Sequence, residues 1–262
     1  MRGLRNMHKG LSAKSHGTTF LAMYEPRTYR HWVKGTDFVP FNVVVKETDL
    51  SILASVNLKR KAQRLVLKYR NMLERYIAQH PLFLTSLEPL PVTDNAPHIA
   101  KAMATAAEKV GVGPMAAVAG AIAEFVGTEL LPFSPEIIIE NGGDIYLKTI
   151  KKRVVGIYAG KSPLTGKIGL EIEGKDTPMG ICTSSGTVGH SLSFGQADAV
   201  TVLSKSATLA DAAATAICNI IKQPSDFAHG IEFARGIDGL TGLIIIKDDK
   251  VGIWGDIKLC QT

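Results

Sequence analysis

Asp211 and Thr215 stand four residues apart in segment 208–221, whose alanine-rich sequence predicts a helix. Residues four apart share one face of a helix, so this carboxylate and this hydroxyl lie side by side. Hard oxygens of this kind bind Mg²⁺, usually with waters and substrate phosphates completing the coordination shell. A second interpretation needs no metal. Thr208 and Asp211 have the spacing of a capping box, and Thr215 can hydrogen-bond to a carbonyl one turn earlier.

A glycine pair lies between two β-rich segments, 136–140 and 145–149. The connection consists of Asn141, Gly142, Gly143 and Asp144. Asn-Gly and Gly-Gly pairs favour a type I′ hairpin turn, which is a purely structural interpretation. The two missing Cβ atoms would also let the backbone approach a flavin or a phosphate closely. Both interpretations of this turn stay open.

A hydroxyl-rich segment follows the expected strand 180–183. It consists of Thr183, Ser184, Ser185 and Gly186. A turn of this type can offer N–H and O–H donors to phosphate oxygens, or it can be an ordinary polar β-turn. His190 comes shortly after it and can act as a general base near neutral pH, or can have a structural role.

Together, these motifs and their order resemble the ApbE family of magnesium-dependent flavin transferases. That family carries GAIAKG, then a GGD turn, then TSG with a downstream His, then ADALATA. The corresponding segments here are 120–124, 140–145, 183–186 with His190, and 210–216. The resemblance covers residues 115–222 and is nearest to a short, uncharacterised cytosolic branch.

The resemblance implies specific roles. Mg²⁺ would be held by Asp211, Thr215 and the main-chain carbonyl of Ala121, while the glycine turn and the hydroxyl-rich segment would contact FAD or FMN. His190 or a nearby hydroxyl would assist the attack of a nucleophile on the pyrophosphate of FAD. A protein threonine as nucleophile gives FMN transfer, and water gives FMN and AMP. The expected partners are a small phosphate-bearing ligand and an acceptor protein of unknown identity.

Two departures from the family pattern leave enzymatic activity open. Glu124 stands where the family has lysine, which inverts a charge where an anionic cofactor is expected. The acid that follows the family histidine is missing after His190. The alternative is a non-catalytic protein that uses the same scaffold to bind a ligand or a partner.

The elements that position these residues follow from periodicity and punctuation. β-branched and aromatic residues predict early strands at 18–24, 29–33 and 38–46. Three helices are expected at 57–80, from a cap at Asn95 to Val110 with Pro97 in the first turn, and at 115–131. Further strands are expected at 136–140, 145–149, 154–158, 168–172, 180–183 and 199–203, then the helix 208–221, then a hairpin of 243–247 with 250–254.

This order predicts an α+β fold with mixed or antiparallel sheets packed against helices. Residues 1–17 are expected to be a basic flexible arm, and residues 18–262 one integrated domain. The chain of 262 residues is 45% hydrophobic and 21% charged, which is typical of a globular protein and excludes disordered and fibrous classes.

Three cysteines, Cys182, Cys218 and Cys260, are expected to be free thiols, and without a signal peptide they favour a cytoplasmic protein. The apolar segment 114–133 is interrupted by Glu124 and Glu129, so no membrane span is expected.

The net charge of +6 is concentrated in the first 75 residues, which hold 15 Lys and Arg against 5 Asp and Glu. Much of it lies in segment 59–75, which is either a solvated helix face or a surface that follows phosphates. No known nucleic-acid motif accompanies it, so a nucleic-acid partner is not expected. The small residues of helix 115–131 suit packing within one core or against a second subunit, so a homo-oligomer remains open.

Overall fold

The computed structural model describes residues 37–188 and 193–262. The expected arm 1–17, the expected strands 18–24 and 29–33, and the candidate base His190 lie outside the described residues.

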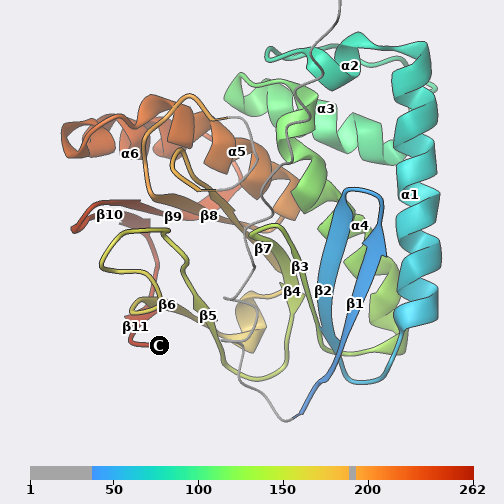
Figure 1. Cartoon of the computed structure of the whole chain (residues 1–262), viewed down its shortest axis with the longest axis horizontal. Helices are drawn as coiled ribbons and strands as arrows, with labels where there is room; N and C mark the ends of the chain where they lie inside the picture. The colour runs from blue at the N-terminus through green and yellow to red at the C-terminus, as the bar shows by residue number, and fades with distance from the viewer. Residues whose placement is uncertain (1–36, 189–192) are drawn as a thin grey trace, which may run out of the picture.

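Helices and strands alternate in blocks along the chain (Figure 1). The strands are β1 (Val39–Val45), β2 (Thr48–Ala54), β3 (Ile137–Asn141), β4 (Asp144–Lys148), β5 (Arg153–Gly156), β6 (Gly169–Ile172), β7 (Met179–Ser184), β8 (Ala199–Ser204), β9 (Leu240–Lys247), β10 (Lys250–Gly255) and β11 (Leu259–Cys260). The α-helices are α1 (Lys59–Gln79), α2 (Leu82–Thr85), α3 (His98–Val110), α4 (Val118–Leu130), α5 (Ala207–Ile220) and α6 (Phe227–Arg235). Short 3₁₀ helices are η2 (Pro114–Ala117), η3 (Leu131–Phe133), η4 (Gly174–Asp176) and η5 (Pro224–Asp226).

An eight-stranded sheet in the order β1-β2-β3-β4-β7-β8-β9-β10 forms the centre of the fold, and each neighbouring pair is antiparallel. Helices α1 to α4 connect β2 to β3, and α5 and α6 connect β8 to β9. The connection from β4 to β7 contains β5 and β6, which form a small antiparallel sheet with β11. The expected α+β fold is thereby confirmed.

The large sheet is covered on both faces, and the alternation of side chains along a strand separates the two cores. In β3, Ile137 and Ile139 belong to the core beneath the helices, whereas Ile138 belongs to the core beneath the small sheet. In β9, Ile245 and Ile244 divide in the same way. Such strands are apolar on both faces, which explains why they appear as continuous β-branched runs in the sequence.

Helix α5 lies against the central strands of this sheet, next to α4 (Figure 1). Its 14 residues include 11 that are buried, and six of these are alanine. Its first residue packs directly on β7, because a Cβ on Gly180 would lie 2.2 Å from the Cα of Ala207. A Cβ on Gly120 of α4 would lie 2.3 Å from the carbonyl oxygen of Ala207. Because Gly180 and Gly120 have no side chain, β7 and α4 can both approach the backbone of α5 at Ala207.

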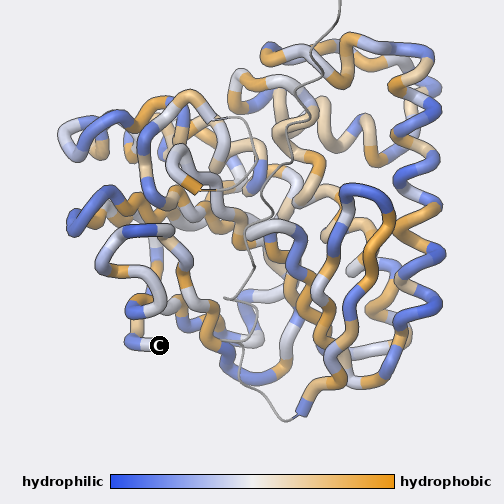
Figure 2. The backbone as a smooth tube through the Cα atoms, viewed as in Figure 1, coloured by the Kyte–Doolittle hydropathy of each residue, from blue (hydrophilic) through white to orange (hydrophobic). Residues whose placement is uncertain are grey.

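Helix α1 packs one apolar stripe on the fold and exposes a hydrophilic side, which Figure 2 shows as blue along its outer edge. The buried stripe has helical spacing and consists of Ala62, Leu65, Val66, Tyr69, Leu73 and Tyr76. Several cations of this helix pair with acids. The Lys68 ammonium group forms an ion pair with the Glu129 carboxylate, and the Arg70 guanidinium lies 3.0 Å from the Glu74 carboxylate. These contacts agree with a solvated helix face.

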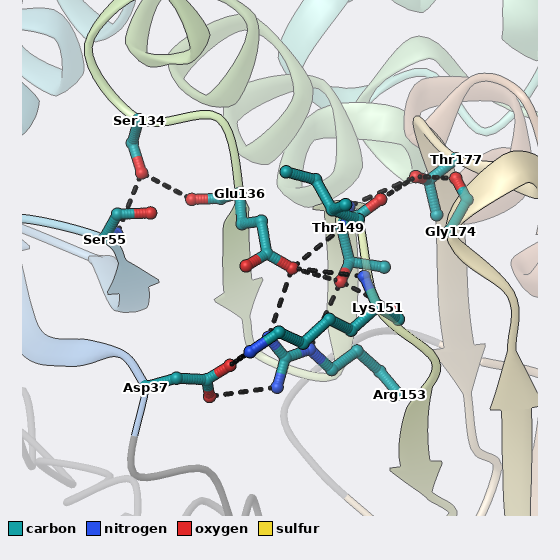
Figure 3. Close-up of polar contacts among 10 residues, drawn as sticks. Asp37, Ser55, Ser134, Glu136, Thr149, Lys151, Arg153, Gly174 and Thr177 are labelled. Atoms are coloured by element: carbon teal, nitrogen blue, oxygen red, sulfur yellow. Dashed lines mark hydrogen bonds and ion pairs between the residues drawn. The ribbon is translucent and has the colours of Figure 1, made fainter.

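Glu136, just before β3, connects strands of both sheets at one end of the fold (Figure 3). One of its carboxylate oxygens accepts hydrogen bonds from the Thr149 hydroxyl at 2.7 Å, the Ile150 N–H at 2.9 Å and the Arg153 guanidinium at 3.2 Å. Arg153 in turn forms a two-pronged ion pair with Asp37. Burial alone would raise the pKa of Glu136, but these hydrogen bonds outweigh it and hold the pKa at about 2.

Some details of the sequence-based prediction were wrong or missing. Strand β2 and helix α6 were not predicted. The predicted cap at Asn95 is wrong, because Pro97 occupies the N-cap position of α3 and makes no side-chain cap bond. The turn of the last hairpin, over residues 248–249, is confirmed by the pairing of Lys247 with Lys250.

Length and apolar composition alone would let Pro114–Phe133 span a membrane. In this structure the segment contains α4, whose buried side chains include Ala121, Ile122 and Val126 in the core. The thiols of Cys182, Cys218 and Cys260 are free, as expected.

Candidate functional site

The glycine turn between β3 and β4 is a two-residue hairpin connection in which Asn141 pairs with Asp144. Gly142 and Gly143 have φ of 72° and 107°, as a type I′ turn requires, so the structural interpretation of this turn is confirmed. The turn also contacts α4, because the Asn141 side-chain amide donates to the carbonyl of Ala119 at 3.0 Å. The turn is therefore held against the start of α4.

Asp211, in the second turn of α5, lies at the same end of α4. Its Oδ2 accepts a hydrogen bond from the backbone N–H of Gly120 at 2.8 Å. Gly120 precedes Ala121, so the structure brings the predicted metal ligands Asp211 and Ala121 close in space although they are 90 residues apart in the chain. Asp211 is only 6% exposed.

The capping box predicted for Thr208 and Asp211 is wrong. Ser206 is the N-cap of α5, and its side chain accepts a hydrogen bond from the N–H of Leu209. Asp211 lies beyond the reach of a capping box because it is directed toward α4 instead. The hydroxyl of Thr208 donates to Glu124 at 2.8 Å.

Glu124, which replaces the family lysine, binds the N-terminus of α5. Its Oε2 accepts hydrogen bonds from the Thr208 backbone N–H at 2.8 Å, the Thr208 hydroxyl and the Ser206 hydroxyl at 2.9 Å. A carboxylate at a helix N-terminus is stabilised by the unpaired N–H groups and by the helix dipole. The negative charge of Glu124 thus has a structural role, because it caps the N-terminus of α5.

The hydroxyls of Ser184 and Thr215 lie 3.1 Å apart, where the end of β7 meets α5. Thr215 is one turn after Asp211, so the pair extends the line of oxygen atoms along the same face of α5. The hydroxyl of Thr183 is directed elsewhere and lies 2.9 Å from that of Thr201. Of the hydroxyl-rich segment, Ser184 is thus the side chain nearest the predicted metal ligands.

Ser185 and Gly186 are used within their own turn. The Ser185 hydroxyl oxygen accepts from the N–H groups of Thr187 and Val188, at 3.1 and 2.9 Å. The N–H of Gly186 donates to the carbonyl of Ala197 at 2.9 Å. The interpretation as a polar turn accounts for these contacts, and their predicted contact with a ligand stays a prediction.

Burial controls the electrostatics of this region. It raises the pKa of Asp211 to about 7, against the opposing effect of hydrogen bonds from Gly120 and Ala119. It raises the pKa of Asp144 well above its ordinary value, and the negative charges of Asp211 and Glu140 raise it further. The buried thiol of Cys182 has a raised pKa for the same reasons, with burial first and then Asp144 and Asp211. Two acids therefore share a buried site, where hydrogen bonds from Cys182 and Thr183 to Asp144, and from Gly120 and Ala119 to Asp211, only partly oppose the effect of burial.

These residues suit a hard divalent cation that brings other ligands with it. Within the ranges 37–188 and 193–262, no three His, Cys, Asp or Glu side chains form a metal cage. The available donors are instead the carboxylates of Asp211 and Asp144 and the hydroxyls of Thr215 and Ser184. Mg²⁺ commonly binds through one or two carboxylates while waters and substrate phosphates fill the other positions. One oxygen of Asp144, Oδ1, is buried and has no hydrogen-bond partner among the described residues.

Sequence reasoning missed two features of this site. The contact between Glu124 and Thr208 joins residues 84 positions apart, and no local pattern indicates it. The approach of Asp144 to Asp211 depends on how β4 and α5 pack, although the position of Asp144 beside a glycine turn was a usable signal. His190 lies outside the described residues, so its predicted role stays a prediction.

Comparisons with known proteins give the following matches. The family described as AbpE bacteria matches residues 30–235. A UPF0280 protein of Methanocaldococcus jannaschii is 47% identical over 229 residues, which are 84% of this chain and 92% of that protein. A UPF0280 protein of Methanopyrus kandleri is 46% identical over 223 residues, which are 81% of this chain and 89% of that protein.

Two solved structures share the fold. The apo flavinyl transferase ApbE of Pseudomonas stutzeri aligns with a TM-score of 0.54 and 13% identity, over 83% of this chain and 93% of that one. The ApbE protein of Thermotoga maritima aligns with a TM-score of 0.52 and 12% identity, over 82% and 96%. At such low identity the likeness shows the fold alone, and it confirms the ApbE-like fold expected from the motifs.

Proposed function

The chain belongs to the family described as AbpE bacteria, and from this premise we propose that it binds a flavin nucleotide with Mg²⁺ and cleaves the pyrophosphate of FAD. The proposed products are AMP and FMN, with the FMN passed to an acceptor hydroxyl or to water. The structural neighbour from Pseudomonas stutzeri is a flavinyl transferase, which makes FAD the first ligand to test.

One observation carries this proposal: the buried carboxylate of Asp211 is fixed at the N-terminus of α4 by the 2.8 Å hydrogen bond from Gly120. This bond places Asp211 beside Ala121, and Thr215 follows one turn later. The three oxygen donors that the family motifs pair with a cation thus come from two helices that meet here.

Bound Mg²⁺ would neutralise the charge of the pyrophosphate oxygens and of the departing AMP. Asp211, Thr215 and the carbonyl of Ala121 would hold the cation. The glycine turn exposes backbone at Gly142, where a flat flavin ring can approach without meeting a side chain.

The remaining step is the attack of a hydroxyl or water oxygen on the phosphorus atom of the FMN half. A bond forms from that oxygen to phosphorus, and the bond from phosphorus to the bridging oxygen breaks, so that AMP leaves with the bridging oxygen. The proton of the attacking group passes to a base, and we assign this role to His190.

The direct test is to incubate the purified protein with FAD and MgCl₂ and to quantify AMP by chromatography. We expect AMP release that EDTA abolishes, and a decrease of about 100-fold or more in Asp211→Asn. Asp249→Asn is the matched control, because Asp249 is an exposed acid in the β9–β10 turn. An Asp211→Asn protein that releases AMP at the wild-type rate would reject this mechanism.

The alternative, a protein that binds flavin without cleaving it, is favoured by one observation. Glu124 occupies the position of the family lysine and is engaged with α5, so no cation is supplied there. Retention of yellow flavin with no AMP release, by wild-type protein in the same assay, would select this alternative.

A further inference from the structure

Asp144 has an unusual position for an acid. It is the first residue of β4, directly after the glycine turn, and it is 7% exposed. Its Oδ1 atom is buried with no hydrogen-bond partner among the described residues. An unpaired polar atom in a protein interior costs free energy and calls for an explanation, and one common explanation is an ion or water that occupies the site.

The neighbours of Asp144 make its position more costly. Asp211 and Glu140 both act on it through their negative charges, and α5, which carries Asp211, packs against β4, which begins at Asp144. Neither Asp144 nor Asp211 forms an ion pair with a lysine or arginine within residues 37–188 and 193–262. Two like charges in a buried site are unfavourable unless a cation or a proton stands between them.

The surroundings of the two acids include further oxygen atoms, beside the buried thiol of Cys182. The hydroxyl pair Ser184 and Thr215 lies at the same junction of β7 and α5. Gly143 lies beside the carbonyl of Thr183, because a Cβ built on it would lie 3.5 Å from that oxygen. Carboxylates, hydroxyls and carbonyls are the ligands that Mg²⁺ and Mn²⁺ prefer.

We propose that Asp144 is a second carboxylate of the cation site, opposite Asp211, so that the cation joins the β3–β4 hairpin to α5. This inference rests on the proposed function for the identity of the site, but it gives Asp144 a role that the family resemblance does not. The resemblance places this residue beside the flavin. The unpartnered oxygen and the facing acid assign it to the metal instead.

A cation shared by two elements has a consequence that can be measured without flavin. When the site is empty, the two acids either repel each other or must take up a proton, and both cost free energy, so the protein without metal is less stable than it would be with one neutral partner. Asp144→Asn replaces one acid with a neutral side chain of the same shape. The same change removes half of the charge that holds a divalent cation.

The experiment measures thermal unfolding and Mn²⁺ binding of the whole chain at about pH 8, with no flavin present. Wild type, Asp144→Asn, Asp211→Asn and the control Asp249→Asn are compared in EDTA and in MnCl₂. Free Mn²⁺ is quantified by electron paramagnetic resonance.

We expect Asp144→Asn to melt at a higher temperature than wild type in EDTA, and to bind Mn²⁺ at least about 10-fold more weakly. Asp249→Asn should match wild type in both measurements. The proposal is overturned if Asp144→Asn binds Mn²⁺ as tightly as wild type. It is also overturned if wild type shows no Mn²⁺-dependent rise in melting temperature, since the two acids would then share only a proton.

Failure of this inference differs from failure of the proposed function. Mn²⁺ binding that needs both acids, together with no AMP release from FAD, supports the two-carboxylate site and rejects cleavage. AMP release that needs Asp211 but not Asp144, with unchanged Mn²⁺ affinity in Asp144→Asn, supports cleavage and rejects the second carboxylate.

Discussion

The carboxylate of Glu124 in α4 accepts a hydrogen bond of 2.8 Å from the backbone N–H of Thr208 in the first turn of α5. In the opposite direction, Asp211 of α5 accepts from Gly120 in the first turn of α4. Each helix therefore has a carboxylate of the other at its N-terminus, where unpaired N–H groups and the helix dipole favour negative charge. This reciprocal contact fixes the position of the acid on which the proposed chemistry depends.

Replacing Glu124 with the family lysine should destabilise the protein. Glu124→Lys removes three hydrogen bonds and puts a cation at the start of α5, so we expect the free energy of unfolding to fall by about 2–4 kcal/mol. Glu124→Gln keeps an acceptor and should cost less. Urea unfolding measures both, with Glu108→Lys on the exposed side of α3 as the charge-reversal control. A Glu124→Lys protein with the wild-type urea midpoint would contradict this role.

A side chain at position 120 should separate α4 from α5. The Cβ of Gly120→Ala would lie 2.3 Å from the Ala207 carbonyl oxygen and 2.8 Å from the Cβ of Asp211. We expect a loss of about 1–3 kcal/mol in the free energy of unfolding, as for an overpacked core. Gly236→Ala is the matched control, since its Cβ would be 3.5 Å from the nearest atom. Equal urea midpoints for the two variants would contradict the close approach.

The hydroxyl of Thr215, but not its methyl group, should matter for activity. Thr215→Val keeps the shape of the side chain and removes the oxygen that lies 3.1 Å from Ser184. We expect AMP release from FAD to fall about 10-fold or more, whereas Thr215→Ser should stay within about 3-fold of wild type. Equal rates for the valine and serine variants would show that the oxygen is not used.

Glu136 makes stability depend on pH in a direction that its pKa determines. Its pKa of about 2 in the folded protein lies below the ordinary 4.5, so its stabilising effect is present above about pH 4.5 and is lost as the pH falls toward 2. The free energy of unfolding of wild type should exceed that of Glu136→Gln by about 2 kcal/mol at neutral pH. Urea unfolding at about pH 7 and about pH 3 measures the gap, which should shrink at the lower pH.

The matched control for this pH test is Glu232→Gln, since the Glu232 side chain is 75% exposed. The free energy of unfolding of Glu232→Gln should differ little from that of wild type at both pH values. A gap for Glu136→Gln that stays constant between the two conditions would show that the contacts in Figure 3 do not favour the ionised carboxylate.

Much of the fold could be predicted because its elements have strong local signals. The helical spacing of α1 and the Asn-Gly-Gly turn of β3–β4 each depend on residues close in the chain, and both are confirmed. The cap of α5 could not be assigned in this way. Ser206 and Thr208 can each serve as a cap by residue type, and the choice depends on Glu124, which reaches them from another helix.

In the candidate site, too, the local features could be predicted from the sequence and the tertiary contacts could not. Asp211 and Thr215 share a helix face by their spacing, which a sequence shows. The approach of Asp211 to Gly120 is a tertiary fact that only the family resemblance indicated, and the nearness of Asp144 was not indicated at all. The second acid was assigned to flavin because the motif gives residue types and order, but not the burial of an oxygen atom or the charge that faces it.

The absence of a side chain at Gly180 has a consequence for how this protein can vary. Because β7 meets the start of α5 through main-chain atoms, the location of Asp211 one turn later is set by backbone geometry. Substitution of the apolar residues around this junction should therefore displace the acid less than a side chain at Gly180 would. A larger residue at position 180 would push the start of α5 away from β7, because its Cβ would lie 2.2 Å from the Cα of Ala207.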